Sequence, residues 1–281
     1  MPLSVPPPID TRPLFRPVSS ALLELLRGLE PADWAKPTIA GTWVVRDVVA
    51  HLVDLTFRRI SFHRDRMDPP PPEAPIRSER DFVEFINTIN AQWVNVSRRF
   101  SARVLTDLFE KASADVADWF EALPLDAPAL FGVSWAGEQQ SEGWFDIGRE
   151  FTELWHHQEQ IRIAVGAPSL PDPRYLHAVI DIAVRGLPYA YRDVSAADRD
   201  SITLAVSGPA GGQWTLSREA HRWILYAGET PSASARITMR DDAAWKLLFN
   251  ALSEQAAAAA IRIDGRAELA APLLRARSVI V

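Results

Sequence analysis

The spacing of apolar residues predicts that the first two-thirds of the chain is helical. Apolar positions recur every three or four residues in several segments, a period typical of amphipathic helices. The predicted helices span residues 19–29, 43–63, 79–99, 102–123, 142–165 and 175–191. Prolines crowd residues 69–75, which excludes regular structure there and predicts a stiff, exposed connector.

The pattern changes after residue 195 to short runs rich in β-branched and aromatic residues, separated by turn-forming residues. These runs predict strands at 202–206, 213–216, 223–226 and 236–239. A helix at 242–252, a strand at 261–263 and a final helix complete a small α+β unit. We therefore predict a helical domain over 15–195 followed by an α+β domain over 196–281.

Composition narrows the classes of function. The chain has 30 Lys and Arg against 36 Asp and Glu without a long block of one sign, so no nucleic-acid or anionic-membrane partner is expected. It has no cysteine, which excludes disulfides, cysteine-type zinc sites and a cysteine nucleophile. Any thiol chemistry must use a thiol from outside. Neither a signal peptide nor a membrane span is expected, which favours a cytoplasmic protein. We expect a monomer or a homodimer.

One histidine stands on the apolar face of the second predicted helix. At about 100° per residue, His51 shares that face with four apolar side chains, namely Val44, Val48, Leu52 and Leu55. We expect His51 to point into the bundle, where a buried imidazole needs a polar partner.

The helix at 142–165 carries a second candidate group. Its apolar stripe consists of Trp144, Ile147, Phe151, Leu154, Ile161 and Val165. An adjacent stripe along its border consists of Asp146, Glu150, Glu153 and His157. Helical geometry places His156 farther round, toward solvent.

Glu153 and His157 lie one helical turn apart, so both side chains can reach one cation. A third ligand from another helix, His51, would leave positions open for water or substrate, as in catalytic zinc sites. Nitrogen and oxygen ligands suit Zn²⁺ and also Ni²⁺, Fe²⁺ or Mn²⁺.

Simpler interpretations stand beside this one. Asp47 or Asp54, each about one turn from His51, could accept a hydrogen bond from it, and Glu153 with His157 could be an ordinary surface pair. A shell closed by Glu150 or Asp146 would indicate a structural metal.

At these residues the chain resembles a known family. Trp43-x-x-x-Asp47-x-x-x-His51-Leu52, followed by Glu153-x-x-x-His157, is similar to the metal-binding pattern of the DinB-like superfamily, in its mycothiol-dependent maleylpyruvate isomerase branch. The resemblance implies a DinB-like four-helix bundle followed by a small α+β domain that resembles sterol carrier protein. It also implies that His51, Glu153 and His157 bind a divalent metal, usually zinc, with water completing the shell.

The chain departs from the family pattern at three points. Gln160 stands where the family often has an acidic residue, and His156 beside His157 leaves the register open by one position. The isomerase uses an arginine after the second helix, where both Arg77 and Arg80 stand; we take Arg80 as the candidate catalytic residue.

Two hypotheses of function follow. In the first, the chain is an enzyme whose metal binds a small thiol such as mycothiol, which attacks an electrophilic small molecule in an isomerisation or conjugation. In the second, it is a non-catalytic metal-binding protein or a carrier of an apolar ligand.

Overall fold

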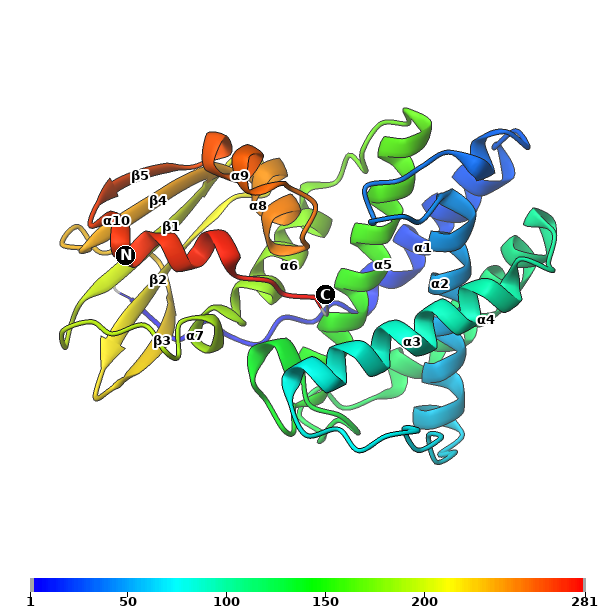
Figure 1. Cartoon of the computed structure of the whole chain (residues 1–281), viewed down its shortest axis with the longest axis horizontal. Helices are drawn as coiled ribbons and strands as arrows, with labels where there is room; N and C mark the ends of the chain where they lie inside the picture. The colour runs from blue at the N-terminus through cyan, green and yellow to red at the C-terminus, as the bar shows by residue number, and fades with distance from the viewer. Residues whose placement is uncertain (1–2, 280–281) are drawn as a thin grey trace.

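A computed structural model describes residues 3–279, in which a helical part lies beside a part built on a β-sheet (Figure 1). The helices that precede the sheet are α1 (Arg12–Arg27), α2 (Val45–Arg58), α3 (Glu79–Ser97), α4 (Ala102–Ala122), α5 (Gly143–Val165), α6 (Pro173–Val184) and α7 (Leu187–Ala190). The proline-rich stretch 69–75 lies between α2 and α3 without regular structure and is exposed, as the sequence predicts.

Four of these helices, α1, α2, α4 and α5, pack around the apolar core of the helical part, and α3 packs on α2. The core side chains come from the apolar stripe of each helix and include Leu22, Val48, Leu105, Phe120 and Phe151, which are all fully buried. The predicted helical bundle is therefore confirmed.

Some predicted boundaries are wrong, and prolines and glycines account for two of them. The first helix starts at Arg12, well before residue 19, because Pro13 lies in its first turn, where a missing N–H is tolerated. The second ends at Arg58 and continues as a π-helical turn, Arg59–Arg64. The helix predicted over 175–191 is interrupted, because α6 ends at Val184 before Gly186 and Pro188.

The second part contains a five-stranded sheet with the order β3-β2-β1-β4-β5. Its strands are β1 (Ser201–Ser207), β2 (Gly212–Glu219), β3 (Arg222–Ala227), β4 (Ala235–Arg240) and β5 (Arg262–Gly265). β1 pairs parallel with β4, and the other pairs are antiparallel. The helices α8 (Asp241–Leu248), α9 (Glu254–Ala260) and α10 (Ala267–Ala270) complete the predicted α+β fold.

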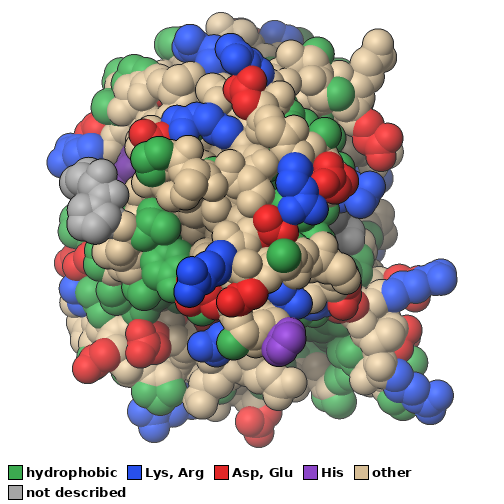
Figure 2. Space-filling model, turned by 90° about the vertical axis from the view of Figure 1, so that its left-hand side faces the viewer, with side chains coloured by type: hydrophobic (Ala, Val, Ile, Leu, Met, Phe, Trp, Pro, Cys, Tyr) green, Lys and Arg blue, Asp and Glu red, His purple; other side chains and the backbone are tan. Residues whose placement is uncertain are grey.

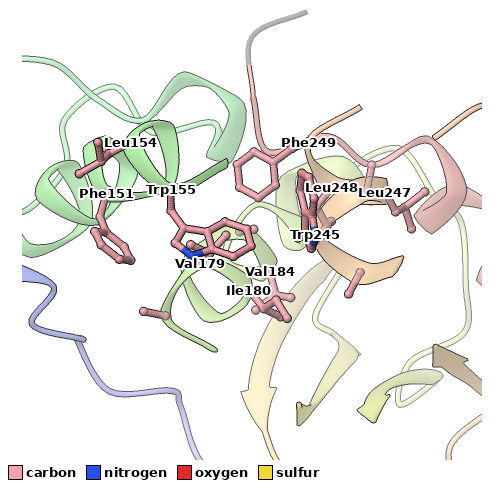
Figure 3. Close-up of a cluster of buried hydrophobic side chains, with 14 of the residues drawn as sticks. Phe151, Leu154, Trp155, Val179, Ile180, Val184, Trp245, Leu247, Leu248 and Phe249 are labelled. Carbon is pink, nitrogen blue, oxygen red and sulfur yellow. The ribbon is translucent and has the colours of Figure 1, made fainter. Parts of the chain in front are cut away.

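The two parts share one continuous apolar core. Trp155 of α5 meets Trp245 of α8 edge to face, with ring centroids 5.5 Å apart, and α6 lies beside them (Figure 3). The switch from helices to strands falls between Ala190 and Ser201, around the predicted boundary. The division into domains over 15–195 and 196–281 stays a prediction.

The surface of the sheet part mixes charges of both signs. Acidic and basic side chains are interspersed on the face that Figure 2 shows. Within residues 3–279, no helix is long and apolar enough to cross a membrane.

Candidate metal centre

His51 is placed by the start of α2. Asp47 caps this helix, because its Oδ2 accepts a hydrogen bond from the backbone N–H of Val44 (3.3 Å). One turn later the imidazole of His51 lies among buried apolar residues, with only 5% of the residue exposed. The prediction that His51 points into the bundle is confirmed.

α5 brings Glu153 and His157 to the same point from the opposite side. The Nε2 atom of His157 lies 3.3 Å from Oε2 of Glu153, and Nε2 of His51 lies 4.0 Å from the same oxygen. One ligand atom from each of the three residues lies within 4.8 Å of the others. This group, which we call the triad, could hold a metal ion after small side-chain rotations.

The imidazole rings of His157 and His51 differ in the hydrogen bonding of their Nδ1 atoms. Nδ1–H of His157 donates to Oε1 of Gln160 (2.7 Å), which leaves the Nε2 lone pair of His157 facing Glu153. Nδ1 of His51 is buried and has no hydrogen-bond partner among residues 3–279. Burying a polar atom without a hydrogen-bond partner is costly. Hydrogen bonds within the chain therefore do not account for the burial of this nitrogen.

The protonation states of His51 and Glu153 suit a cation. Burial lowers the pKa of His51, which keeps its ring neutral near pH 7. Burial alone would raise the pKa of Glu153, but the neighbouring imidazoles of His157 and His51 outweigh it and hold that pKa well below its usual range. Metal binding requires a neutral imidazole and an ionised carboxylate, and the fold supplies both.

The two aspartates that could have paired with His51 are engaged elsewhere. Asp47 caps α2 and lies 3.7 Å from the guanidinium of Arg98, while Asp54 pairs with Arg58. The interpretation of His51 as a core histidine bonded to a neighbouring aspartate is therefore wrong.

Asp146 and Glu150, the two candidates for a fourth ligand, bind a buried arginine. Arg59 donates two hydrogen bonds to Asp146 (2.6 and 2.7 Å) and one to Glu150 (2.7 Å), and Arg149 contacts both carboxylates. A role for Arg59 was not predicted from the sequence. The positions of Asp146 and Glu150 beside an apolar stripe were the signal in the sequence for such a partner, because buried carboxylates need a buried cation.

His156 is not directed to solvent, as the sequence analysis expected. It is 2% exposed, and its ring stacks on Phe249, with centroids 4.7 Å apart. The angle of His156 around the helix predicted exposure. The second part of the chain covers this side of α5, however, and buries the residue. The register is settled in favour of His157, since it is His157 that joins the triad.

The structure does not bring Arg80 or Arg77 to the triad. Arg80 lies in the first turn of α3 with its side chain 86% exposed, and its guanidinium pairs with Glu84 at 2.8 Å. Arg77 is also exposed just before the same helix. A catalytic role for Arg80 stays a prediction.

Glu153 also borders a small, partly open cavity. The cavity has a volume of about 30 Å³, and its walls come from α1, α2, α4 and α5. Glu150, Ser19 and Thr56 line it together with Glu153, among apolar residues. This space can take a water molecule beside the carboxylate that faces the two histidines.

Comparisons with known proteins agree with this fold. The family model for the mycothiol maleylpyruvate isomerase N-terminal domain matches residues 15–162. The fold is similar to a solved mutant of the mycothiol-dependent maleylpyruvate isomerase, with a TM-score of 0.54 and 12% identity over 90% of this chain and 91% of that one. A second structure of this isomerase gives a TM-score of 0.51 and 14% identity, covering 84% and 86%. No curated protein matches the chain.

Proposed function

Because the chain belongs to the mycothiol maleylpyruvate isomerase N-terminal domain family, we propose that it is a metal-dependent enzyme that uses an external thiol. Its substrate would be an electrophilic small molecule such as a maleylpyruvate-like unsaturated acid. The thiol would be mycothiol or a similar low-molecular-weight compound.

One observation carries the proposal, namely the convergence of His51, Glu153 and His157 from two helices within 4.8 Å. These side chains come from positions far apart in the sequence and are nearly buried. Two imidazoles and one carboxylate form a donor set suited to Zn²⁺, and also to Ni²⁺, Fe²⁺ or Mn²⁺.

The residues of the triad would hold the cation and fix its charge environment. Glu153 would supply the negative charge, and Gln160 would keep the Nε2 of His157 free for binding. When bound, a divalent cation favours the deprotonated form of a thiol or water at its open position.

The thiol must come from outside, because the chain has no cysteine. In the proposed isomerisation, the thiolate adds to one carbon of the double bond, and the electron pair moves onto the conjugated carbonyl. Rotation about the resulting single bond follows, and the C–S bond then breaks to restore the double bond and release the thiolate. Conjugation would stop after the addition, with a proton taken up at the neighbouring carbon.

An arginine would hold the carboxylate of such a substrate through paired hydrogen bonds. Arg80 is proposed for this role by family resemblance alone, since in the structure its guanidinium pairs with Glu84.

The alternative, a structural metal in a carrier protein, would favour a closed shell of four protein ligands. The two nearest candidates for a fourth ligand, Asp146 and Glu150, are hydrogen-bonded to Arg59. Three protein ligands leave a position for an exchangeable group, which supports the enzyme over the carrier.

Metal analysis followed by thiol-binding calorimetry tests the proposal. We expect one divalent cation per chain and binding of mycothiol to the metal-loaded protein but not to the chelator-treated protein. His51→Ala is the matched control and should lose both. A chain that binds no divalent cation, or binds thiol equally well without it, would contradict the proposal.

A further inference from the structure

His156 lies between a proposed metal ligand and the second part of the chain. Its ring centroid is 4.0 Å from that of His157, with a 37° angle between the planes. It is also 4.7 Å from the ring of Phe249, at 25°. The ring of His156 therefore contacts both Phe249 and His157.

The fold fixes Phe249 at the end of α8. The backbone N–H of Asn250 bonds to the carbonyl of Leu247 (3.2 Å), and that of Ala251 bonds to Lys246 (2.7 Å). Asn250 has a φ of +56°, so these bonds form the Schellman motif that ends many helices. Phe249 precedes this turn and is 3% exposed, and its ring lies between α8 and α5 (Figure 3).

His156 is held at its edge as well as at its faces. Its Nδ1–H donates to the carbonyl oxygen of Thr152, one turn earlier in α5 (2.7 Å). With this bond in place, the ring can adjust mainly by tilting, and its contacts with Phe249 and His157 limit that tilting. His157 is itself held at its Nδ1 edge by Gln160, so His156 supplies a restraint on its face.

We propose that Phe249 is a positioning residue for His157 and acts through His156. The inference rests on the proposed metal site, because it assigns a role to the surroundings of one ligand. Groups that contact a metal ligand set its orientation and thereby the affinity and geometry of the site. The packing of α8 on α5 and the arrangement of the triad are consequently linked.

Phe249→Leu tests this, with Trp245→Leu as the matched control. Both substitutions replace a buried aromatic side chain in the contact between α8 and α5, but Trp245 packs on Trp155 and Phe249 stacks on His156. Each full-length variant is loaded with Co²⁺. Affinity is measured by chelator competition, geometry by the visible absorption of the bound cobalt, and folding by circular dichroism.

We expect Phe249→Leu to weaken Co²⁺ binding by roughly 3- to 10-fold, the range expected for the loss of an aromatic contact behind a ligand, and to change the absorption spectrum. Trp245→Leu should keep the wild-type spectrum and bind within about 2-fold of wild type, because a purely structural loss does not reach the ligand. Equal weakening in both variants would overturn the proposal.

Unchanged affinity and spectrum in Phe249→Leu, beside a wild type that binds cobalt, would overturn only the positioning role. A wild type that binds no cobalt would overturn the metal site and this inference together.

Discussion

His51 and His157 meet nearly at right angles across two helices, with ring centroids 4.8 Å apart and planes inclined by 81°. Their Nε2 atoms both face Oε2 of Glu153, at 4.0 and 3.3 Å. The carboxylate of Glu153 is ionised, and its charge needs a positive partner in this nearly buried position. A cation at this point would balance the carboxylate charge and use both nitrogen lone pairs.

The two adjacent histidines of α5 should behave differently when truncated. His157→Ala removes a ligand and should lose most of the bound metal. His156→Ala removes only the ring behind that ligand, so it should reach full metal content at saturating concentration, with weaker affinity. Metal analysis after equilibrium dialysis measures both; the reverse ranking would show that the triad is assigned to the wrong histidine.

Gln160 should tune the affinity through its hydrogen bond to His157. Gln160→Leu leaves Nδ1 of His157 without its acceptor and should weaken metal binding by about 10- to 100-fold. Gln160→Glu restores an acceptor with a negative charge, as in much of the family, and should bind at least as tightly as the wild type. Chelator competition measures the three proteins, and equal affinities would exclude a role for this bond.

Arg59 should be essential for stability. Arg59→Met leaves Asp146 and Glu150 as buried carboxylates without their main cation, which should lower the free energy of unfolding by roughly 3–5 kcal/mol. Arg80→Ala is the control, because the side chain of Arg80 is exposed and its loss should barely change the denaturation midpoint. Urea denaturation measures both. If Arg80 also holds the substrate, Arg80→Ala should lose activity at unchanged stability.

His63 should make the protein less stable in mild acid. Burial first, and then the charge of Arg59, lowers its pKa to about 4, although Glu150 opposes this. The unfolded chain has a pKa near 6.5 at this position and takes up the proton first as the pH falls. The stabilisation is therefore complete above about pH 6.5 and is lost progressively toward pH 4.

His63→Gln removes this titration. Its melting temperature should fall less between pH 7 and pH 5 than that of the wild type, as differential scanning fluorimetry would show. An identical decrease in both proteins would mean that His63 is not held neutral by its surroundings.

Local sequence patterns were sufficient to predict much of the fold. The stripe of α5 and the apolar face of α2 follow from helical periodicity, which depends only on spacing along the chain. The start of α1 at Arg12 was not predicted; Pro13 lies in the first turn of this helix, where a proline is tolerated, and Pro17 lies inside it. The π-helical turn after Arg58 has no recognisable signal in the sequence.

The candidate site, too, could be predicted only in part from the sequence. His51, Glu153 and His157 each lie on a predictable face of one helix, so their convergence could be proposed from family resemblance and phase. The surroundings of His156 could not be predicted, because Phe249 belongs to another part of the chain and reaches α5 only through tertiary packing. Similarly, Arg59 finds Asp146 and Glu150 on a different helix.

Thiol titration of the cobalt-substituted protein tests the central claim most directly. If the triad holds a metal with an exchangeable position, a thiol should bind there as the thiolate, and binding should tighten as the pH rises toward the pKa of the free thiol. Sulfur ligation gives Co²⁺ a charge-transfer band, and since the chain has no cysteine, the band can come only from the added thiol. We expect the band with the wild type and not with His157→Ala. Its absence with mycothiol and every simpler thiol, in protein that retains cobalt, would contradict the account.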